Sequence, residues 1–224
     1  LVPYIDWTPF FRAWELAGTY PSILSDNVVG ESARSLFADA QKMLEQVAGE
    51  RWLGARGVVG FWPVRREGDD IVVFSDENRE DEIGRFPMLR QQIVKRAGRP
   101  NMCLADFISP DADWLGGFAV TGGEGIDLHS ERFRRAHDDY SDIMLKALAD
   151  RLAEAFAEYL HERVRRELWG YAPDERLTNE ELIKERYNGI RPAPGYPACP
   201  DHMLKPELFR LLGATAATGI VLTE

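Results

Sequence analysis

The sequence predicts an α+β protein in which a twisted, mainly antiparallel sheet is flanked by helices, one of them long. The first observation is a helical period, because apolar residues recur every three or four positions over 31–49 and again over 130–168. The second is a change of period between those two stretches. Four short runs there are typical of strands, and their short connections favour antiparallel pairing: 56–65, 71–75, 104–109 and 114–121.

The segments before the sheet predict two helices. Thr8 is expected as the N-cap of a short helix over 9–17, with Pro9 in the first helical position, where its missing donor costs nothing. The helix over 31–49 follows, and the turn 67–70 joins the first two strands. The expected buried face of the second helix comprises Ala33, Leu36, Phe37, Ala40, Met43, Leu44 and Val47.

The segments after the sheet are expected to be mostly helical. The long helical stretch is expected to be interrupted near Asp138. Thr178 and Glu181 have the spacing of a capping box, which predicts a short helix to about residue 187. Pro206 is expected to start a final helix, and 219–223 is a candidate for one more strand.

Composition narrows the classes of protein. The chain has 224 residues, 45% of them hydrophobic and 29% charged, which is typical of a globular protein. Its net charge of −10 argues against a nucleic-acid or anionic-membrane surface. Two distant cysteines suit a reducing compartment, and no membrane span or signal peptide is visible, so we expect a cytoplasmic location. The chain begins at Leu1 without an initiator methionine, as a fragment would.

Residues 191–202 are the most informative segment, reading RPAPGYPACPDH. Four prolines and a glycine exclude a regular helix or a central strand and indicate a stiff extended loop. Such a loop loses little entropy when it holds a ligand. Arg191 supplies a fixed cation, Gly195 a closely approachable backbone and Tyr196 an aromatic ring with a polar tip. A purely structural surface loop fits the same composition.

Carboxylates form the second group of candidates. Asp150, Glu154 and Glu158 recur every four residues and should share one helix face, which could equally be an ordinary solvated face. Glu154 lies in a run with little charge, where a carboxylate bordering an apolar pocket would attract a cationic ligand group. Asp6, between Ile5 and Trp7, fits either a residue favoured by the helix dipole or a ligand contact.

Together these residues predict a pocket for a ligand with a carboxylate, an ammonium and another positive centre, such as an amino-acid-like sulfonium. Arg191 would bind the carboxylate in bidentate geometry, and the acidic residues would face the positive groups. The predicted ligand-binding residues are Asp6, Glu154, Arg191, Ala193, Gly195 and Tyr196.

Other familiar sites are not indicated. Cys199 and His202 could touch one metal, but two ligands in a proline-rich loop are a weak signal, and we predict no metal site. The glycine-rich run 122–125 lacks the spacing of a dinucleotide-binding loop and is expected to be a turn. The chain has no Gly-x-Ser-x-Gly nucleophile motif, and we predict no catalytic residue of its own.

Three motifs in register carry a resemblance to a known family. Residues 191–202, the segment YIDWTPFF over 4–11 and the segment ALADRLAEAFAEYLHE over 147–162 resemble the C-terminal activation domain of cobalamin-dependent methionine synthase. The similarity covers the whole chain in the right order. It implies a single α+β domain over 1–224 that binds S-adenosylmethionine through the six residues named above.

The resemblance also implies a reaction. In that family cobalamin is occasionally oxidised to an inactive state, and the activation domain presents the methyl group of S-adenosylmethionine while a flavodoxin-type reductant supplies an electron. The implied partners are the cobalamin-binding domain of the same polypeptide and that reductase. Cobalamin would be held by the partner domain and zinc by another domain, so this fragment alone is not expected to make methionine.

One departure and two alternatives accompany the resemblance. The family continues past the segment that ends at Glu224 into a further aromatic-rich strand that touches the ligand, so the domain is expected to be truncated and its pocket incomplete. A stand-alone methyltransferase would need a base that the sequence does not indicate. A non-catalytic docking module that uses the acidic face around Asp150 is the second alternative.

Overall fold

The computed structural model describes residues 1–223, which divide into two compact units. Unit 1 comprises residues 1–56 and 120–188, and unit 2 comprises 57–119 and the chain from Gly189 onward. The chain passes from one unit to the other within β1 (Gly54–Glu67), within β4 (Asp113–Glu124) and after Asn188. The two predicted ligand-binding motifs that contain Asp6 and Arg191 therefore belong to different units.

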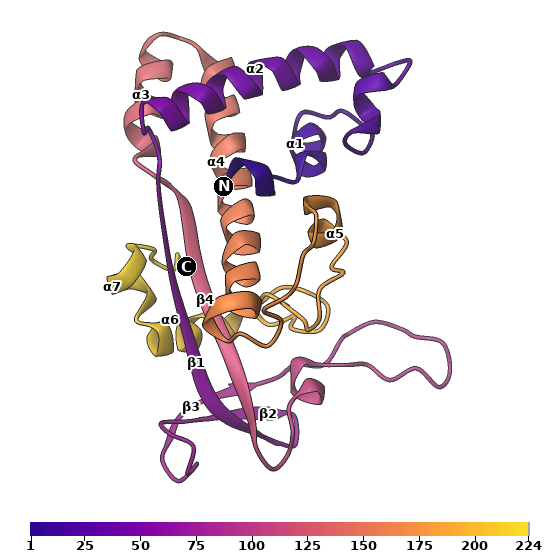
Figure 1. Cartoon of the computed structure of the whole chain (residues 1–224), viewed down its shortest axis with the longest axis vertical. Helices are drawn as coiled ribbons and strands as arrows, with labels where there is room; N and C mark the ends of the chain where they lie inside the picture. The colour runs from indigo at the N-terminus through magenta and orange to yellow at the C-terminus, as the bar shows by residue number, and fades with distance from the viewer. Residues whose placement is uncertain (224) are drawn as a thin grey trace. The chain divides into compact units, whose positions relative to one another are not determined.

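Unit 1 is helical and packs around α4, as Figure 1 shows. Its core joins aromatic residues of α1 to the apolar faces of α2 and α4, including Phe10, Phe11, Leu44 and Leu148. The helices are α1 (Trp7–Ala13), α2 (Gly30–Gly49), α3 (Ile126–Arg135), α4 (Asp139–Arg163) and α5 (Asn179–Ile183), with 3-10 turns at Val2–Tyr4 and Ser22–Ser25 and a π-helical turn at Val164–Leu168.

Unit 2 contains a four-stranded sheet in the order β3-β2-β1-β4, with β2 (Asp70–Phe74) antiparallel to β1 and to β3 (Glu82–Pro87). Val64, Ile71, Val73 and Phe86 from these strands form a core with both cysteines. The remaining elements are 3-10 turns at Leu104–Phe107 and His202–Leu204, and helices α6 (Lys205–Leu212) and α7 (Ala214–Thr218). The α+β class with a mainly antiparallel sheet is thus confirmed.

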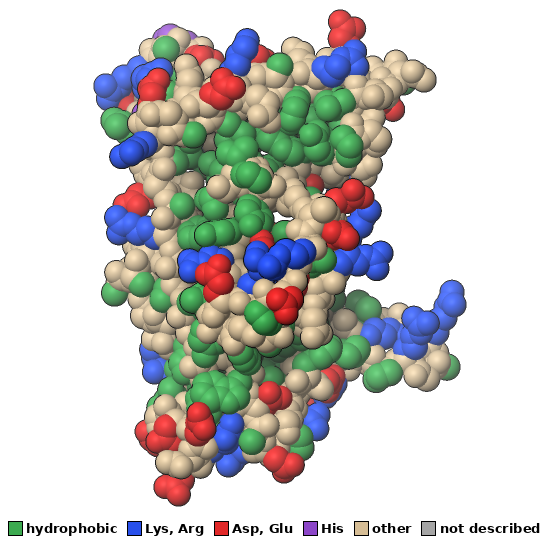
Figure 2. Space-filling model, viewed as in Figure 1, with side chains coloured by type: hydrophobic (Ala, Val, Ile, Leu, Met, Phe, Trp, Pro, Cys, Tyr) green, Lys and Arg blue, Asp and Glu red, His purple; other side chains and the backbone are tan. Residues whose placement is uncertain are grey.

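The segment between β3 and the turn at Leu104 projects from the sheet (Figure 1), and basic side chains lie along it in Figure 2. Its base is held by Arg90, whose guanidinium bonds to Asp69 and Asp106. Among residues 1–223, no helix combines the length and the apolar character needed to cross a membrane.

Several predicted elements are confirmed and others are wrong. The interruption of the long helix lies where it was expected, because Asp138 caps α4 by accepting a hydrogen bond from the Ser141 amide. The segment 104–109 is a 3-10 turn rather than a strand, and the strand β3, which the sequence did not indicate, takes its place in the sheet. The segment 219–223 forms no strand. Glu224 lies outside the described residues.

Candidate ligand-binding site

Asp6 is the N-cap of α1, so the prediction that Thr8 caps this helix is wrong. The Asp6 carboxylate accepts a hydrogen bond from the Thr8 amide at 2.9 Å, and the Asp6 backbone is extended. The helix therefore begins at Trp7, two residues earlier than the position of Pro9 suggested. This geometry confirms the favourable place of a carboxylate at a helix N-terminus, and it engages one oxygen of the Asp6 carboxylate.

The residues on either side of Asp6 hold the segment Tyr4–Asp6, here called the N-terminal segment, against unit 1. Ile5 and Trp7 are buried, with 2% and 7% of their surfaces exposed. The Tyr4 hydroxyl donates a 2.7 Å hydrogen bond to the Glu162 carboxylate of α4. The side-chain amide of Asn179, at the start of α5, donates to the Ile5 carbonyl at 3.2 Å. Asp6 is thus placed by contacts with two helices far away in sequence.

The pKa values of Tyr4 and Glu162 depend on the hydrogen bond between the two side chains. Burial and the hydrogen bond to the Glu162 carboxylate raise the pKa of Tyr4 to about 12. Burial also raises the pKa of Glu162, but hydrogen bonds from Tyr4 and Arg166 outweigh burial, so the net pKa is lowered. At neutral pH the pair is therefore a neutral phenol donating to a carboxylate, which is a strong form of hydrogen bond.

Glu154 lies on α4, and its side chain is exposed. The end of β4 packs so closely on this part of the helix that a Cβ on Gly122 would lie 2.7 Å from the Ala153 amide nitrogen. Gly122 is therefore required for the close approach beside Glu154. The three carboxylates spaced four residues apart differ in environment, because Asp150 is exposed and paired with Arg151 whereas Glu158 is 8% exposed.

The loop 191–202 of unit 2 is held by bonds within itself. The Gly195 amide donates to the Cys199 carbonyl at 2.8 Å, and Tyr196 and Cys199 form an isolated β-bridge. Gly195 has φ +109°, and a Cβ there would lie 2.7 Å from the His202 ring. Arg191 is partly buried, whereas Tyr196 is 57% exposed. The loop therefore presents an aromatic ring and exposed backbone on a locally fixed scaffold.

Cys199 and His202 have separate structural surroundings. Cys199 is 4% exposed in the core of unit 2, and burial raises the pKa of its thiol. The His202 ring packs beside Gly195. Within residues 1–223, no group of three or more His, Cys, Asp or Glu side chains could hold a metal ion.

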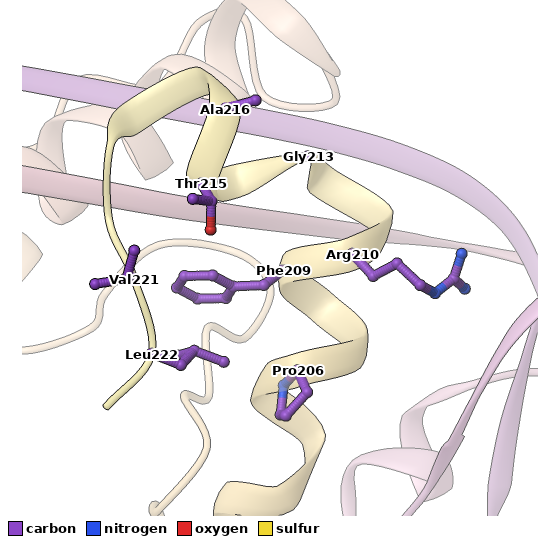
Figure 3. Close-up of a pocket in the computed structure, with 8 residues that line it drawn as sticks. All are labelled: Pro206, Phe209, Arg210, Gly213, Thr215, Ala216, Val221 and Leu222. Carbon is purple, nitrogen blue, oxygen red and sulfur yellow. The ribbon is translucent and has the colours of Figure 1, made fainter. Parts of the chain in front are cut away.

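A surface cavity of about 510 Å³ lies elsewhere in unit 2, between α6, α7 and the segment that follows them (Figure 3). Phe209 points toward Val221 and Leu222 across it, and its lining is mostly apolar. None of the six predicted ligand-binding residues lines this cavity.

Sequence reasoning missed four residues that lie beside the candidate residues: Tyr4, Gly122, Asn179 and His202. Asn179 and Tyr4 act over long sequence distances that no local pattern reveals. Gly122 was interpreted as part of a turn, although glycine within a strand can also mark a close approach of another backbone. His202 was weighed only as a metal ligand.

The chain is an α+β protein with a helical unit and a unit built on a mainly antiparallel sheet. Comparison with known proteins gives its family. A model of the vitamin B12 dependent methionine synthase activation domain matches residues 1–224. A crystal structure of the MetH reactivation domain bound to AdoHcy is similar with 56% identity and a TM-score of 0.94, over 100% of this chain and 70% of that chain. The chain therefore belongs to the activation domain family of vitamin B12 dependent methionine synthase.

This membership does not favour a stand-alone methyltransferase or a docking module. The family is part of an enzyme, methionine synthase, whose activation domain works with other domains. The resemblance inferred from the three sequence motifs is thus confirmed over the whole chain.

Proposed function

We propose that this chain binds S-adenosylmethionine and presents its methyl group for the reductive remethylation of inactivated cobalamin. The observation that carries the proposal is the 56% identity, over the entire chain, to a domain solved with AdoHcy. AdoHcy is what remains of S-adenosylmethionine after its methyl group has left. A domain of this family that holds AdoHcy therefore fits the product side of such a transfer.

The proposed ligand contacts are those expected from the sequence. In unit 1, the exposed Glu154 and the N-cap Asp6 would supply negative charge for the positive groups of the ligand. In unit 2, Arg191 would bind the ligand carboxylate, while the backbone at Ala193 and Gly195 and the exposed Tyr196 would contact the remainder. Bidentate pairing with a guanidinium is the strongest of these contacts.

In this proposal the chain contributes binding and orientation and no nucleophile, so its effect on rate comes from proximity. Cobalamin, held by a partner domain of the same polypeptide, supplies the methyl acceptor after a flavodoxin-type reductase has delivered an electron. The loop 191–202 would hold its part of the ligand on a scaffold that is fixed by its own backbone hydrogen bonds. We further propose that zinc belongs to another domain and that the chain 1–224 acts as one activation domain in the cytoplasm. By itself, the chain does not make methionine from homocysteine in this proposal.

Isothermal titration calorimetry with S-adenosylmethionine tests the proposal. Arg191→Ala should weaken binding by about 1.5–3 kcal/mol, the scale of a hydrogen bond to a charged group. Arg210→Ala is the matched control, because it removes another arginine of unit 2, at the apolar cavity outside the proposed contacts. Equal affinity in wild type and Arg191→Ala would remove Arg191 from the site, whereas a loss in Arg210→Ala would move the site to the cavity.

A second assay separates the proposed role from a stand-alone methyltransferase. Methyl transfer from S-adenosylmethionine should require both the cobalamin-binding domain and a reductant. Turnover by this chain without cobalamin would contradict the proposal.

A further inference from the structure

Asn179 has an unusual environment for a polar side chain near a candidate binding residue. It is the first residue of α5, and the capping box of Thr178 and Glu181 fixes the start of that helix. The Glu181 carboxylate accepts from the Thr178 amide at 2.8 Å, and Thr178 accepts from the Glu181 amide at 3.3 Å. The capping box therefore fixes the Asn179 backbone independently of any contact that the Asn179 side chain makes.

The Asn179 side chain reaches the backbone beside Asp6. Its amide nitrogen donates to the Ile5 carbonyl across 174 positions of sequence. Because a peptide unit is planar, the Ile5 carbonyl and the Asp6 amide turn together. A hydrogen bond that fixes the direction of this carbonyl also restricts rotation about the Asp6 N–Cα bond, and with it the direction of the Asp6 side chain.

The hydrogen-bonding groups of the Asn179 side chain are only partly satisfied. Its carbonyl oxygen is buried and has no hydrogen-bond partner within residues 1–223. A buried acceptor without a partner is destabilising, and each such group in a folded protein requires an explanation. The neighbouring contacts already anchor the segment, since Ile5 and Trp7 are buried and Tyr4 bonds to Glu162.

We propose that Asn179 is a positioning residue for ligand binding, which holds the peptide plane between Ile5 and Asp6 and thereby directs the Asp6 carboxylate toward the ligand. One Asp6 carboxylate oxygen accepts from the Thr8 amide, and the other would face the ligand. This inference rests on the proposed function, in which Asp6 contacts S-adenosylmethionine. It adds Asn179 of α5 as a residue that influences ligand binding indirectly, through the backbone next to Asp6.

A double-mutant cycle between Asn179→Ala and Asp6→Asn tests the inference, with S-adenosylmethionine affinity as the readout. Asparagine is also a good N-cap, so Asp6→Asn removes the charge while keeping α1. We expect Asn179→Ala to weaken binding by about fivefold to tenfold, a typical size for coupling between contacting residues. In the Asp6→Asn background the same substitution should cause no further loss, because Asn179 acts through the Asp6 carboxylate.

Two additional variants keep the test decisive. Glu180→Ala is the control on the same helix, since Glu180 is exposed, pairs with Lys184 and should leave affinity unchanged. Asn179→Asp preserves the size of the side chain and is favoured at a helix N-terminus, but an ionised carboxylate cannot donate to the Ile5 carbonyl. It should therefore reproduce the affinity loss in a protein whose ligand-free melting temperature is retained.

The possible outcomes separate the inference from the proposed function. Unchanged affinity in both Asn179 variants, together with a loss in Asp6→Asn, would overturn the inference and leave the proposed function standing. Additive losses in the double variant would also overturn it, because Asn179 would then act independently of Asp6. Unchanged affinity in Asp6→Asn would remove Asp6 from the site and overturn the inference, whereas absence of S-adenosylmethionine binding by wild type would overturn the proposed function.

Discussion

The N-terminal segment Tyr4–Asp6 and the loop 191–202 carry candidate ligand contacts but are held in opposite ways. The first is fixed by side chains 158 and 174 positions away, from Glu162 and Asn179. The second is fixed by backbone bonds between residues three or four apart, such as Gly195 to Cys199, and by its own prolines. Distant substitutions in unit 1 should therefore disturb Asp6, whereas the loop should respond only to changes within itself.

The largest expected effect comes from a glycine of unit 1. Gly122→Ala should lower the free energy of unfolding by about 3 kcal/mol, because the new methyl group meets the backbone of α4 at Ala153, which cannot rotate away. Gly123→Ala is the matched control, since its Cβ would lie at an ordinary 3.7 Å from Ala149. Urea denaturation of both variants measures the difference. Equal stabilities would contradict close strand-to-helix packing beside Glu154.

The loop should respond to a change within itself. Gly195→Ala should cost about 2 kcal/mol, because φ +109° is a conformation that residues with a side chain rarely adopt. Repeating the substitution in a His202→Ala background removes the contact with the imidazole ring and leaves only the backbone strain. Thermal melting should therefore still show a loss in that background. Full recovery there would mean that crowding by His202, rather than φ, makes glycine necessary.

A smaller effect is expected at the long-range contact of the N-terminal segment. Tyr4→Phe should cost about 1 kcal/mol through loss of the hydrogen bond to Glu162. Tyr140→Phe is a matched control, because it loses a similar bond to Asp39 elsewhere in unit 1. Both variants should melt earlier, but only Tyr4→Phe should weaken S-adenosylmethionine binding. Equal affinities in the two variants would show that this anchor does not influence Asp6.

The last effect is a dependence of stability on pH that appears only outside the neutral range. The pKa of Tyr4 is raised to about 12, so its contribution is complete below its ordinary value of 10.0 and is lost as pH rises toward 12. The lowered pKa of Glu162 acts in the other direction, and its contribution is lost as pH falls below its ordinary value of 4.5. Denaturation of wild type and Tyr4→Phe between pH 9 and 12 should show a shallower decline in the variant. Parallel curves would contradict the coupling.

The sequence was sufficient to predict the features that depend only on residues close together in the chain. The proline-rich loop, the helix α2 and the capping box of α5 follow from composition, period and spacing, and the structure contains all three. The strand β3 was missed because its residues, EIGRFP, lack a clear alternation of apolar and polar side chains. The segment 104–109 resembled a strand, but Asp106 bonds to the Cys103 amide and closes a 3-10 turn instead.

The candidate residues also divide into those that the local sequence identifies and those whose role depends on distant packing. Arg191, Gly195 and Tyr196 could be chosen from the loop alone, and Gly195 indeed requires its glycine conformation. The roles of Asn179 and Tyr4 could not be predicted, because they depend on which helix packs beside residue 5. Asp6 was expected in the extended entry before the helix, and its place as the N-cap was assigned to Thr8, because Pro9 is favourable in the first helical position.

The central claim is that this chain binds S-adenosylmethionine with contacts from both Asp6 and Arg191. The most direct measurement is a calorimetric titration of the ligand into wild type, Asp6→Asn and Arg191→Ala at one salt concentration and neutral pH. The account predicts one ligand per chain in wild type and a weaker dissociation constant in each variant, with both variants folded. Absence of binding by wild type, or the same dissociation constant in all three proteins, would contradict it.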